Sequence, residues 1–207
     1  MSDHLVSLVK KANAKGFHDA LRRLLEEEEP VSLSGATFEE LTLTGFDFSD
    51  VDLTNCAFEN CTLSECRFGE SKLEGAFFDA VTLLHCHFQG GELDGWAIDA
   101  STLARCTFEE LTLSQAEWTD CRLTDCHLRE VRAQGWWMER ITFDRGRWEG
   151  VAVEEGEWTH VTLRQLTING LEVGDLSARN CYHVESTLVG GEWPQGLHEK
   201  SGRRKTL

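Results

Sequence analysis

Large apolar residues recur at every fifth position along most of this chain. The register runs without a slip from Leu33 to Trp193, and of its 33 positions only Ala133, Ala178 and His183 are not large and apolar. A chain that is 41% hydrophobic would place about 13 or 14 apolar residues there by chance. A period of five matches neither the helical 3.6 nor the strand's 2, so we expect a backbone that turns a corner once in five residues.

A second class of mostly small residues stands two places before each of these positions, as at Ala36, Cys56 and Ala76. The other three places of each unit hold mainly Thr, Ser, Asp, Glu, Gly, Asn and Arg. Each unit therefore has two inward residues, one small and one large, and three outward ones. A single turn of such a chain cannot bury its large side chains, whereas stacked turns bury a continuous column.

This pattern resembles the pentapeptide-repeat family, whose unit is a small residue, a polar residue, Leu or Phe, and two variable polar residues. The resemblance covers residues 31–193. It implies an all-β solenoid, a right-handed quadrilateral β-helix of roughly eight coils with about 20 residues in each coil. Coils stacked about 4.8 Å apart would make a rod roughly 40 Å long. The alternation of Leu and Phe then places Leu on two opposite faces and Phe on the other two.

Residues 1–30 lie outside the register and predict an N-terminal cap of one or two short α-helices. Leu5 and Val9 share one helical face, with Gly16 as the expected C-cap, and a second apolar stripe begins at Phe17. Pro30 stops this second helix. A solenoid needs such a cap because its first coil exposes apolar side chains and unpaired backbone groups.

Residues 31–194 make up the predicted β-helix, and residues 195–207 predict a flexible basic tail. The pattern contains no helix that could cover the last coil. We therefore expect Leu188, Val189 and Trp193 to form an exposed end, and a homodimer through this coil would cover them.

All eight cysteines occupy the small inward position. This favours free thiols that pack as small hydrophobic groups over disulfides or a metal site, because the spacing follows the repeat and no CxxC pair is present. His85-Cys86-His87 comes nearest to a ligand cluster, but the cysteine points inward and the histidines outward. We expect no metal and no cofactor. Reduced thiols, with neither a signal peptide nor a transmembrane run, favour a cytoplasmic location.

Catalysis has little support in the sequence. It contains no Ser/His/Asp arrangement at a recognisable elbow, no phosphate-binding loop and no pair of carboxylates in a cleft. A stacked rod also lacks a concave pocket. We expect a protein that is not an enzyme and has no catalytic residues.

Acidic residues are the first candidates for function. The chain has a net charge of −16, and residues 31–194 hold 29 acidic and 11 basic residues. Outward positions 20 apart should stack into two ladders: Glu39, Glu59, Asp79, Asp99 and Glu139 on one face, and Asp50, Glu70, Glu110 and Glu130 on the opposite one. Stacked like charges destabilise neighbouring strands, so packing does not require them.

Two outward aromatic residues, Phe77 and Trp137, share the face of the first ladder and are candidate anchors for a partner. Isolated aromatic residues are common on protein surfaces, so the interpretation that these two have no binding role stays open. Trp137 belongs to a stretch in which Ala133 replaces a large interior residue and Trp136 a small one. We expect a deformed coil there, with Trp137 exposed or folded across a corner.

A rigid rod this acidic repels nucleic acid and attracts basic grooves. The chain is similar to pentapeptide-repeat proteins that protect DNA gyrase and topoisomerase IV from quinolones and peptide poisons and are thought to act as DNA mimics. The resemblance implies a DNA-mimic rod that binds a type II topoisomerase and modulates or protects it from a toxin or antibiotic, without binding nucleic acid or membrane itself. The chain departs from those proteins in its N-terminal helices and in lacking a C-terminal helix and an inserted loop.

The alternative is a structural or adaptor solenoid. Such a protein would bind another protein through its flat faces or its N-terminal helices. Loss of partner binding on removal of the helices, with the rod still folded, would favour the adaptor.

Overall fold

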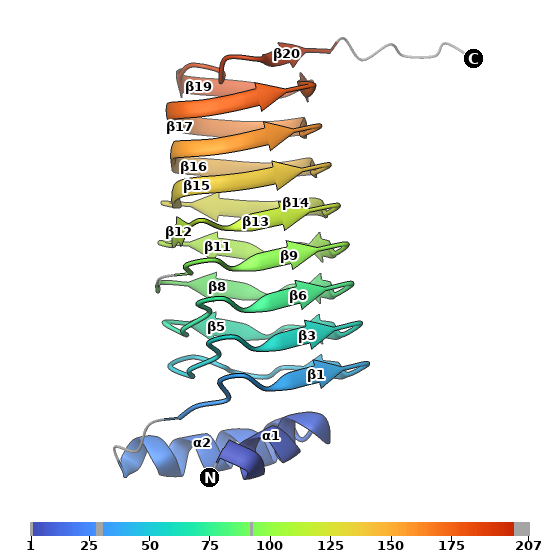
Figure 1. Cartoon of the computed structure of the whole chain (residues 1–207), viewed down its shortest axis with the longest axis vertical. Coiled ribbons are helices and arrows are strands. Elements are labelled where there is room, and N and C mark those ends of the chain that lie inside the picture. Colours follow the sequence, from blue (N-terminus) through green and yellow to red (C-terminus); the bar gives the residue numbers. More distant parts are fainter. Residues whose placement is uncertain (1, 28–30, 92, 201–207) are drawn as a thin grey trace, which may run out of the picture.

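In this computed structural model the backbone turns a corner every five residues and stacks coil upon coil (Figure 1). The structure describes residues 2–27, 31–91 and 93–200. Strands pair in parallel with strands 20 residues further along the chain, so that Phe38 lies beside Phe58 and Phe58 beside Phe78. About eight coils form the rod, and the predicted quadrilateral β-helix is confirmed.

Short strands define four faces in the first coils. Face 1 contains β1 (Thr37–Glu39), β3 (Ala57–Glu59), β6 (Phe77–Asp79), β9 (Ala97–Asp99) and β13 (Glu117–Thr119). Face 2 contains β2 (Thr42–Thr44), β4 (Thr62–Ser64), β7 (Thr82–Leu84) and β10 (Thr102–Ala104). Face 3 contains β5 (Arg67–Gly69), β8 (His87–Gln89) and β11 (Thr107–Glu109), and face 4 contains β12 (Thr112–Ser114).

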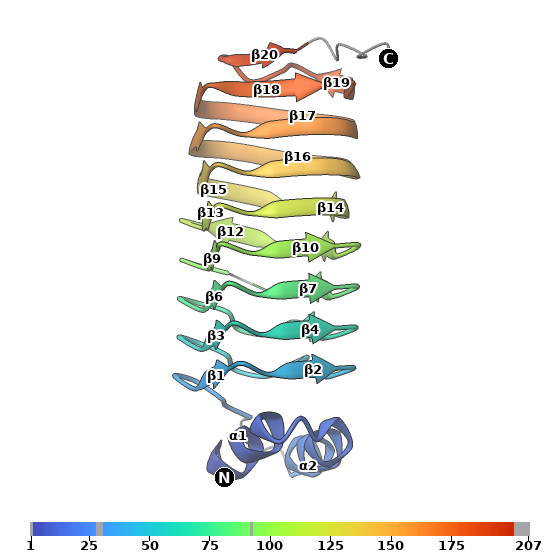
Figure 2. The same cartoon turned by 90° about the vertical axis from the view of Figure 1, so that its right-hand side faces the viewer.

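Longer strands carry these faces around the corners in the later coils (Figure 2). They are β14 (Arg122–Arg129), β15 (Arg132–Glu139), β16 (Thr142–Thr159) and β17 (Thr162–Arg179), followed by β18 (Cys181–Val184), β19 (Thr187–Gly191) and β20 (Leu197–Glu199). Residues 137–139 and 157–159 continue face 1. Residues 122–124, 142–144 and 162–164 continue face 2.

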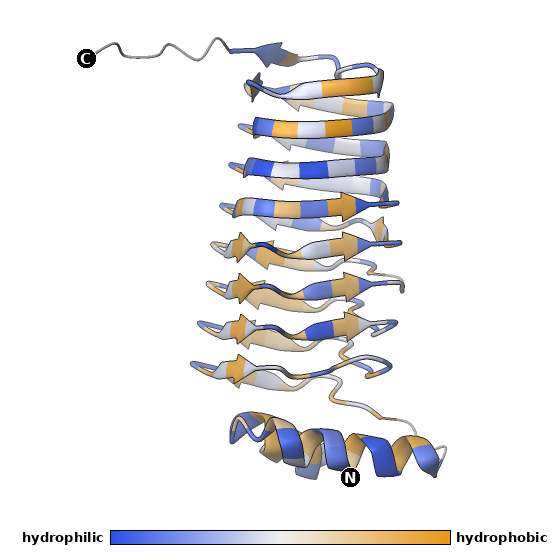
Figure 3. Cartoon of the chain, turned by 180° about the vertical axis from the view of Figure 1, so that it is seen from behind, coloured by the Kyte–Doolittle hydropathy of each residue, from blue (hydrophilic) through white to orange (hydrophobic). Residues whose placement is uncertain are grey.

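The core is a set of vertical columns, because inward residues of successive coils stack. Apolar and polar residues alternate along the strands and repeat from coil to coil (Figure 3). On face 3, the rings of Phe68 and Phe88 are stacked with centroids 4.6 Å apart, and Phe108 continues the stack at 5.1 Å. Leu columns such as Leu43 and Leu63 line face 2. Leu and Phe therefore occupy alternate faces, as predicted.

The coil of residues 131–140 is irregular on its C-terminal side. Trp136 is fully buried, and its indole packs edge-on against Trp118 at 5.1 Å, while the small Ala133 takes the neighbouring interior place. Pairing with β12 and β13 stays in register, but the pairing of β15 with β16 shifts between Ala133 and Trp136. The predicted deformation is thus a local shift of one strand pair, and Trp137 is exposed.

Two helices, α1 (Ser2–Lys10) and α2 (Ala14–Glu26), lie across the N-terminal end of the rod (Figures 1 and 2). Leu5 and Val9 of α1 are buried. The ring of Phe17 lies 5.5 Å from that of Phe46 and 5.4 Å from that of Phe48, in the first coil. These contacts confirm the predicted cap. Neither helix is long and apolar enough to cross a membrane.

The boundary between the two helices differs from the prediction. Gly16 is not a C-cap: it lies in the first turn of α2, and its N–H donates to Oδ1 of the N-cap residue Asn13 at 2.9 Å. A Cβ at Gly16 would lie 2.6 Å from the Asn13 amide nitrogen. The close approach of the Asn13 side chain therefore leaves no room for a Cβ at position 16. The two helices are separated at Ala12, whose φ is +49°.

The C-terminal end is also more ordered than the predicted tail. Residues 197–199 form β20, which pairs with β18, and Leu197 is buried. The indole of Trp193 stacks on the imidazole of His183, with ring centroids 4.2 Å apart and planes 7° from parallel. The prediction that the tail begins at residue 195 is therefore wrong, and residues 201–207 lie outside the described part of the chain.

Candidate partner-binding surface

The first acidic ladder is a column on face 1. Register pairing places Glu39 beside Glu59, Glu59 beside Asp79, and Asp79 beside Asp99. Thr119 follows Asp99, and Glu139 then resumes the column. The structure therefore brings together the five carboxylates that the spacing predicts, with one gap. Because the coils stack about 4.8 Å apart, the column presents negative charge at nearly constant intervals from Glu39 to Asp99.

The second acidic ladder lies at a corner, at the end of face 3. Its members are all exposed and adopt left-handed backbone conformations, with φ values of 50° to 60°: Asp50, Glu70, Glu110 and Glu130. Gly90 occupies the missing place in this column. The prediction placed this ladder on the opposite face from the first, and the corner is the edge of that face. Turn residues here do not share the flat strand surface of the first ladder.

Phe77 and Trp137 are both exposed on face 1, with 38% and 55% of their surfaces accessible. Beside Trp137 is a shallow groove of about 350 Å³ that reaches Glu139 and Arg179. Beside Phe77 is a second groove of about 260 Å³. The two grooves share Glu117 as a lining residue. Face 1 therefore combines an acidic column with two aromatic side chains, each beside a shallow groove.

The predicted dimer end is only partly exposed. Leu188 and Trp193 are half-buried, whereas Val189 has 59% of its surface accessible. β20 and the stack of Trp193 on His183 cover part of the last coil. A groove of about 740 Å³ remains beside Trp193, lined by residues 173–177 and 192–195. The expected exposure therefore holds for Val189 but only in part for Leu188 and Trp193, because the chain folds back after the last repeat.

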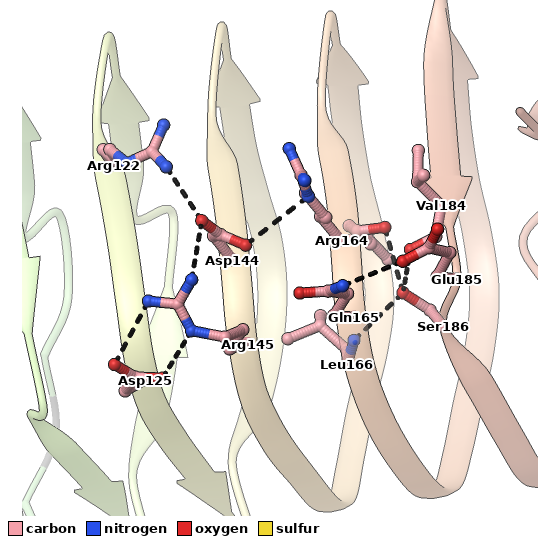
Figure 4. Close-up of polar contacts among 11 residues, drawn as sticks. Arg122, Asp125, Asp144, Arg145, Arg164, Gln165, Leu166, Val184, Glu185 and Ser186 are labelled. Carbon is pink, nitrogen blue, oxygen red and sulfur yellow. Dashed lines mark hydrogen bonds and ion pairs between the residues drawn. The ribbon is translucent and has the colours of Figure 1, made fainter. Parts of the chain in front are cut away.

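One charged group on face 2 was missed by the sequence analysis (Figure 4). Asp144 is 5% exposed, and three arginines from three successive coils surround its carboxylate. Nη2 of Arg122 lies 2.8 Å from Oδ2 of Asp144, Nη1 of Arg145 lies 3.4 Å from the same oxygen, and Nε of Arg164 lies 3.8 Å from Oδ1. We call Arg122, Arg145 and Arg164 the arginine cluster.

A sequence signal for this cluster did exist. Thr42, Thr62, Thr82 and Thr102 form a column on face 2, and Arg122 interrupts it. Asp144 and Arg164 then follow each other in the adjacent outward column of that face. Two oppositely charged residues in one column, Asp144 and Arg164, stand beside the column in which Arg122 replaces threonine. This combination indicates that the surface chemistry changes at these coils.

The cysteines have the environment of core residues. All eight are free and buried. Burial raises the pKa of Cys56 to about 11 and that of Cys121 to about 12, which disfavours the thiolate that metals and electrophiles require. Within the described ranges, no group of three or more His, Cys, Asp or Glu side chains is arranged to hold a metal ion. His85-Cys86-His87 thus offers no such ligand set.

Parallel coils of five-residue units, with small and large residues alternating inward, define a pentapeptide β-solenoid. The family model for pentapeptide repeats (8 copies) matches residues 32–69, and the model for the pentapeptide repeat region matches residues 62–136. Together they span just over half of the chain. The chain belongs to the pentapeptide-repeat family. A comparison with curated proteins finds no match.

Comparison with solved structures gives matches at low identity. A trypsin-treated form of QnrB1, a plasmid-mediated fluoroquinolone resistance protein, is 18% identical with a TM-score of 0.50, over 75% of this chain and 83% of that one. HetL, a pentapeptide repeat protein involved in heterocyst differentiation regulation in the cyanobacterium Nostoc, is 14% identical with a TM-score of 0.27, over 80% and 92%. WceF of Pantoea stewartii, a glycan biofilm modifying enzyme, is 12% identical with a TM-score of 0.40, over 82% and 31%.

Proposed function

We propose that this protein is a non-enzymatic DNA mimic of the cytoplasm. It binds a type II DNA topoisomerase, DNA gyrase or topoisomerase IV, and modulates it or protects it from a toxin or antibiotic. QnrB1, which shares the fold, is a fluoroquinolone resistance protein, and the proposal extends that property to this chain.

The observation that carries the proposal is the charge of the N-terminal half of the rod. Residues 31–104 contain 13 acidic and two basic residues, which gives a net charge of −11. These nearly four coils rise about 18 Å at 4.8 Å per coil, so there is about one net charge per 1.6 Å of axis. Duplex DNA carries one charge per about 1.7 Å. The first half of the rod therefore matches the duplex in charge per unit length.

Face 1 supplies the contact surface in this proposal. Its column of Glu39, Glu59, Asp79 and Asp99 would take the place of a run of phosphates in a basic DNA-binding groove. Phe77 lies in the neighbouring outward column of the same face, next to that of Asp79, and would anchor the rod by burying its ring. A surface of this charge repels nucleic acid, so we expect no direct binding of DNA.

A gyrase supercoiling assay tests the proposal, with the protein titrated in the presence and absence of a quinolone. Inhibition or rescue is expected from the wild type and should be lost in Glu59→Lys/Asp79→Lys. The control is Glu154→Lys/Glu155→Lys, which changes the net charge equally at exposed positions away from face 1. Circular dichroism confirms that each variant is folded. No effect of the wild type at micromolar concentration, or equal loss in both variants, would refute the proposal.

We also propose a homodimer through the C-terminal coil. Val189 is exposed on the last coil, and beside the groove at Trp193 no strand among the described residues pairs with the C-terminal edge of β17 over residues 173–177. Such edges are commonly covered by pairing or assembly. Light scattering should give the dimer mass for the wild type and the monomer mass for Val189→Glu. A monomeric wild type would refute the dimer.

One observation favours the adaptor alternative. Leu25 of α2 has 47% of its surface exposed, and it borders a groove of about 570 Å³ with His18, Leu21 and Asp47. A partner helix could bury this apolar side chain. If a lysate protein captured by the wild type is lost with Leu25→Glu but kept with Glu59→Lys/Asp79→Lys, the adaptor function is supported in place of DNA mimicry.

A further inference from the structure

The arginine cluster is a local concentration of positive charge on an acidic rod. Of the 11 basic residues in residues 31–194, nine lie at or beyond Arg105, and three of these form the cluster on face 2. Asp144 and Asp125 are the carboxylates in direct contact with them. Three guanidinium groups against two carboxylates leave an excess of positive charge at this place. Arg105 adds to it: the hydrogen bond from Arg145 is the main cause that lowers the pKa of Asp125, and the charge of Arg105 acts in the same direction.

The need to pair the buried carboxylate of Asp144 does not explain why three arginines surround it. A buried carboxylate is costly unless it is paired, and the 2.8 Å hydrogen bond from Arg122 already pairs Asp144. Arg164 lies 3.8 Å from Oδ1, which receives no hydrogen bond among the described residues. Threonine occupies the equivalent of Arg122 in the four preceding coils, so the strand itself does not require arginine there.

The cluster is held in place and still open to solvent. Two nitrogens of Arg145 donate to the carboxylate of Asp125 at 3.0 and 3.4 Å, and a third lies 3.4 Å from Asp144. The side chains of Arg122, Arg145 and Arg164 nevertheless remain more than half exposed. Each guanidinium has five N–H donors, so most donors of the cluster face solvent. Ordering these long side chains beforehand lowers the entropic cost of binding an anion.

We propose that the arginine cluster is a docking site for an acidic segment of a partner protein. Carboxylates of that segment would accept paired hydrogen bonds from the outward N–H groups of Arg122 and Arg164, on either side of Asp144. Guanidinium and carboxylate groups match each other in planar geometry, which gives such contacts direction as well as charge.

The size of the cluster favours a short acidic segment over a nucleic acid. The three arginines belong to three successive coils and so span about 10 Å of the rod. A duplex that lay along face 2 would continue past the cluster and bring further phosphates against a rod whose net charge is strongly negative. A peptide with a few carboxylates can end where the positive charge ends.

A binding experiment with a synthetic probe tests this site independently of gyrase. The probe is a fluorescein-labelled dodecapeptide of alternating Glu and Ser, compared with the same peptide carrying Gln in place of Glu. Fluorescence anisotropy with the full chain should show binding of the Glu peptide alone, stronger at about 0.02 M salt than at about 0.15 M. A mixed-sequence DNA duplex serves as the competing class of ligand.

The decisive variant is Arg122→Gln/Arg164→Gln, which leaves Arg145 to pair with Asp144. We expect this variant to bind the Glu peptide about tenfold more weakly, as for the loss of one or two charge-assisted hydrogen bonds. Arg132→Gln/Arg147→Gln changes the net charge equally at exposed positions outside face 2 and should bind as the wild type does. Absence of wild-type binding, equal loss in both variants, or tighter binding of the duplex would overturn the proposal.

Discussion

Trp136 and Trp137 are neighbours in the chain but point to opposite sides of β15. Trp136 is completely buried against Trp118 and Trp158, whereas Trp137 has 55% of its surface exposed beside the acidic column. Side chains alternate between the two sides of a strand, so adjacent indoles here have opposite environments. Trp136 therefore contributes to the stability of the core, whereas Trp137 is available for contact with a partner.

This pair gives a matched test of the two roles. Trp136→Ala should lower the free energy of unfolding by about 3–5 kcal/mol, because it leaves a cavity in the core. Trp137→Ala should change it by no more than about 0.5 kcal/mol. Denaturant unfolding measures both values. The gyrase assay should show that Trp137→Ala, although stable, acts more weakly than the wild type. Equal stability losses in the two variants would contradict the assignment of their environments.

The buried thiols should be chemically silent in the folded protein. Burial raises the pKa of Cys56 to about 11 and of Cys121 to about 12, so at about pH 8 these thiols remain protonated. All eight thiols are also buried away from solvent, so a chromogenic thiol reagent should label none of them in the native protein and all eight after denaturation. Rapid native labelling of even one thiol would show that part of the core opens to solvent.

His183 should make the last coil sensitive to acid. Burial lowers the pKa of His183, although Glu199 acts in the opposite direction. Because the unfolded chain has the higher pKa, near 6.5, it takes up a proton before the folded state does. Stability of this coil is therefore complete at neutral pH and is lost as the pH falls below about 6.5.

Hydrogen exchange can locate this effect. Protection factors in β18 should fall between about pH 7.5 and pH 5.5, while those in β4 change less. In His183→Phe, which keeps an aromatic ring against Trp193 but cannot take up a proton, the difference should shrink. If β18 responds to pH as strongly in the variant as in the wild type, another group is responsible.

The five-residue register predicted a backbone that turns a corner in every unit, and the resemblance to the pentapeptide-repeat family implied four units per coil and therefore the acidic columns. It succeeds because each unit meets the same neighbours 20 residues away, so one inward pattern determines every layer. The same reasoning placed Trp137 at an outward position but left open whether it was exposed or folded across a corner, and the structure shows it exposed. With four units per coil, as the resemblance implied, acidic residues 20 apart at outward positions, such as Glu59 and Asp79, could likewise be placed side by side.

The features that escaped prediction depend on contacts outside this register. The start of α2 depends on the Asn13 side chain meeting the backbone of Gly16, and β20 depends on the chain turning back over Cys181. The arginine cluster arises because long side chains from different columns converge on Asp144. The repeat determines which positions face solvent but not where a flexible guanidinium group reaches.

The corner residues of the second acidic ladder lead to a final prediction, about stability. Glu130 has a φ of 54°, in the left-handed region that disfavours residues with a Cβ. Asparagine tolerates this conformation better, because its short side chain can hydrogen-bond to the local backbone. We expect Glu130→Asn to raise the free energy of unfolding by about 0.5–1 kcal/mol, measured by denaturant unfolding. The gain also includes relief of repulsion from Glu110, its neighbour in the same column.

A control separates conformation from charge. Glu172 is an exposed residue of β17 whose backbone is not left-handed, and Glu172→Asn removes the same charge. Asparagine is poorly suited to a strand, so this variant should be no more stable than the wild type. If both variants gain equally, the benefit comes from reduced negative charge alone. In that case the acidic columns destabilise the rod generally, and their retention would have to be explained by what they bind.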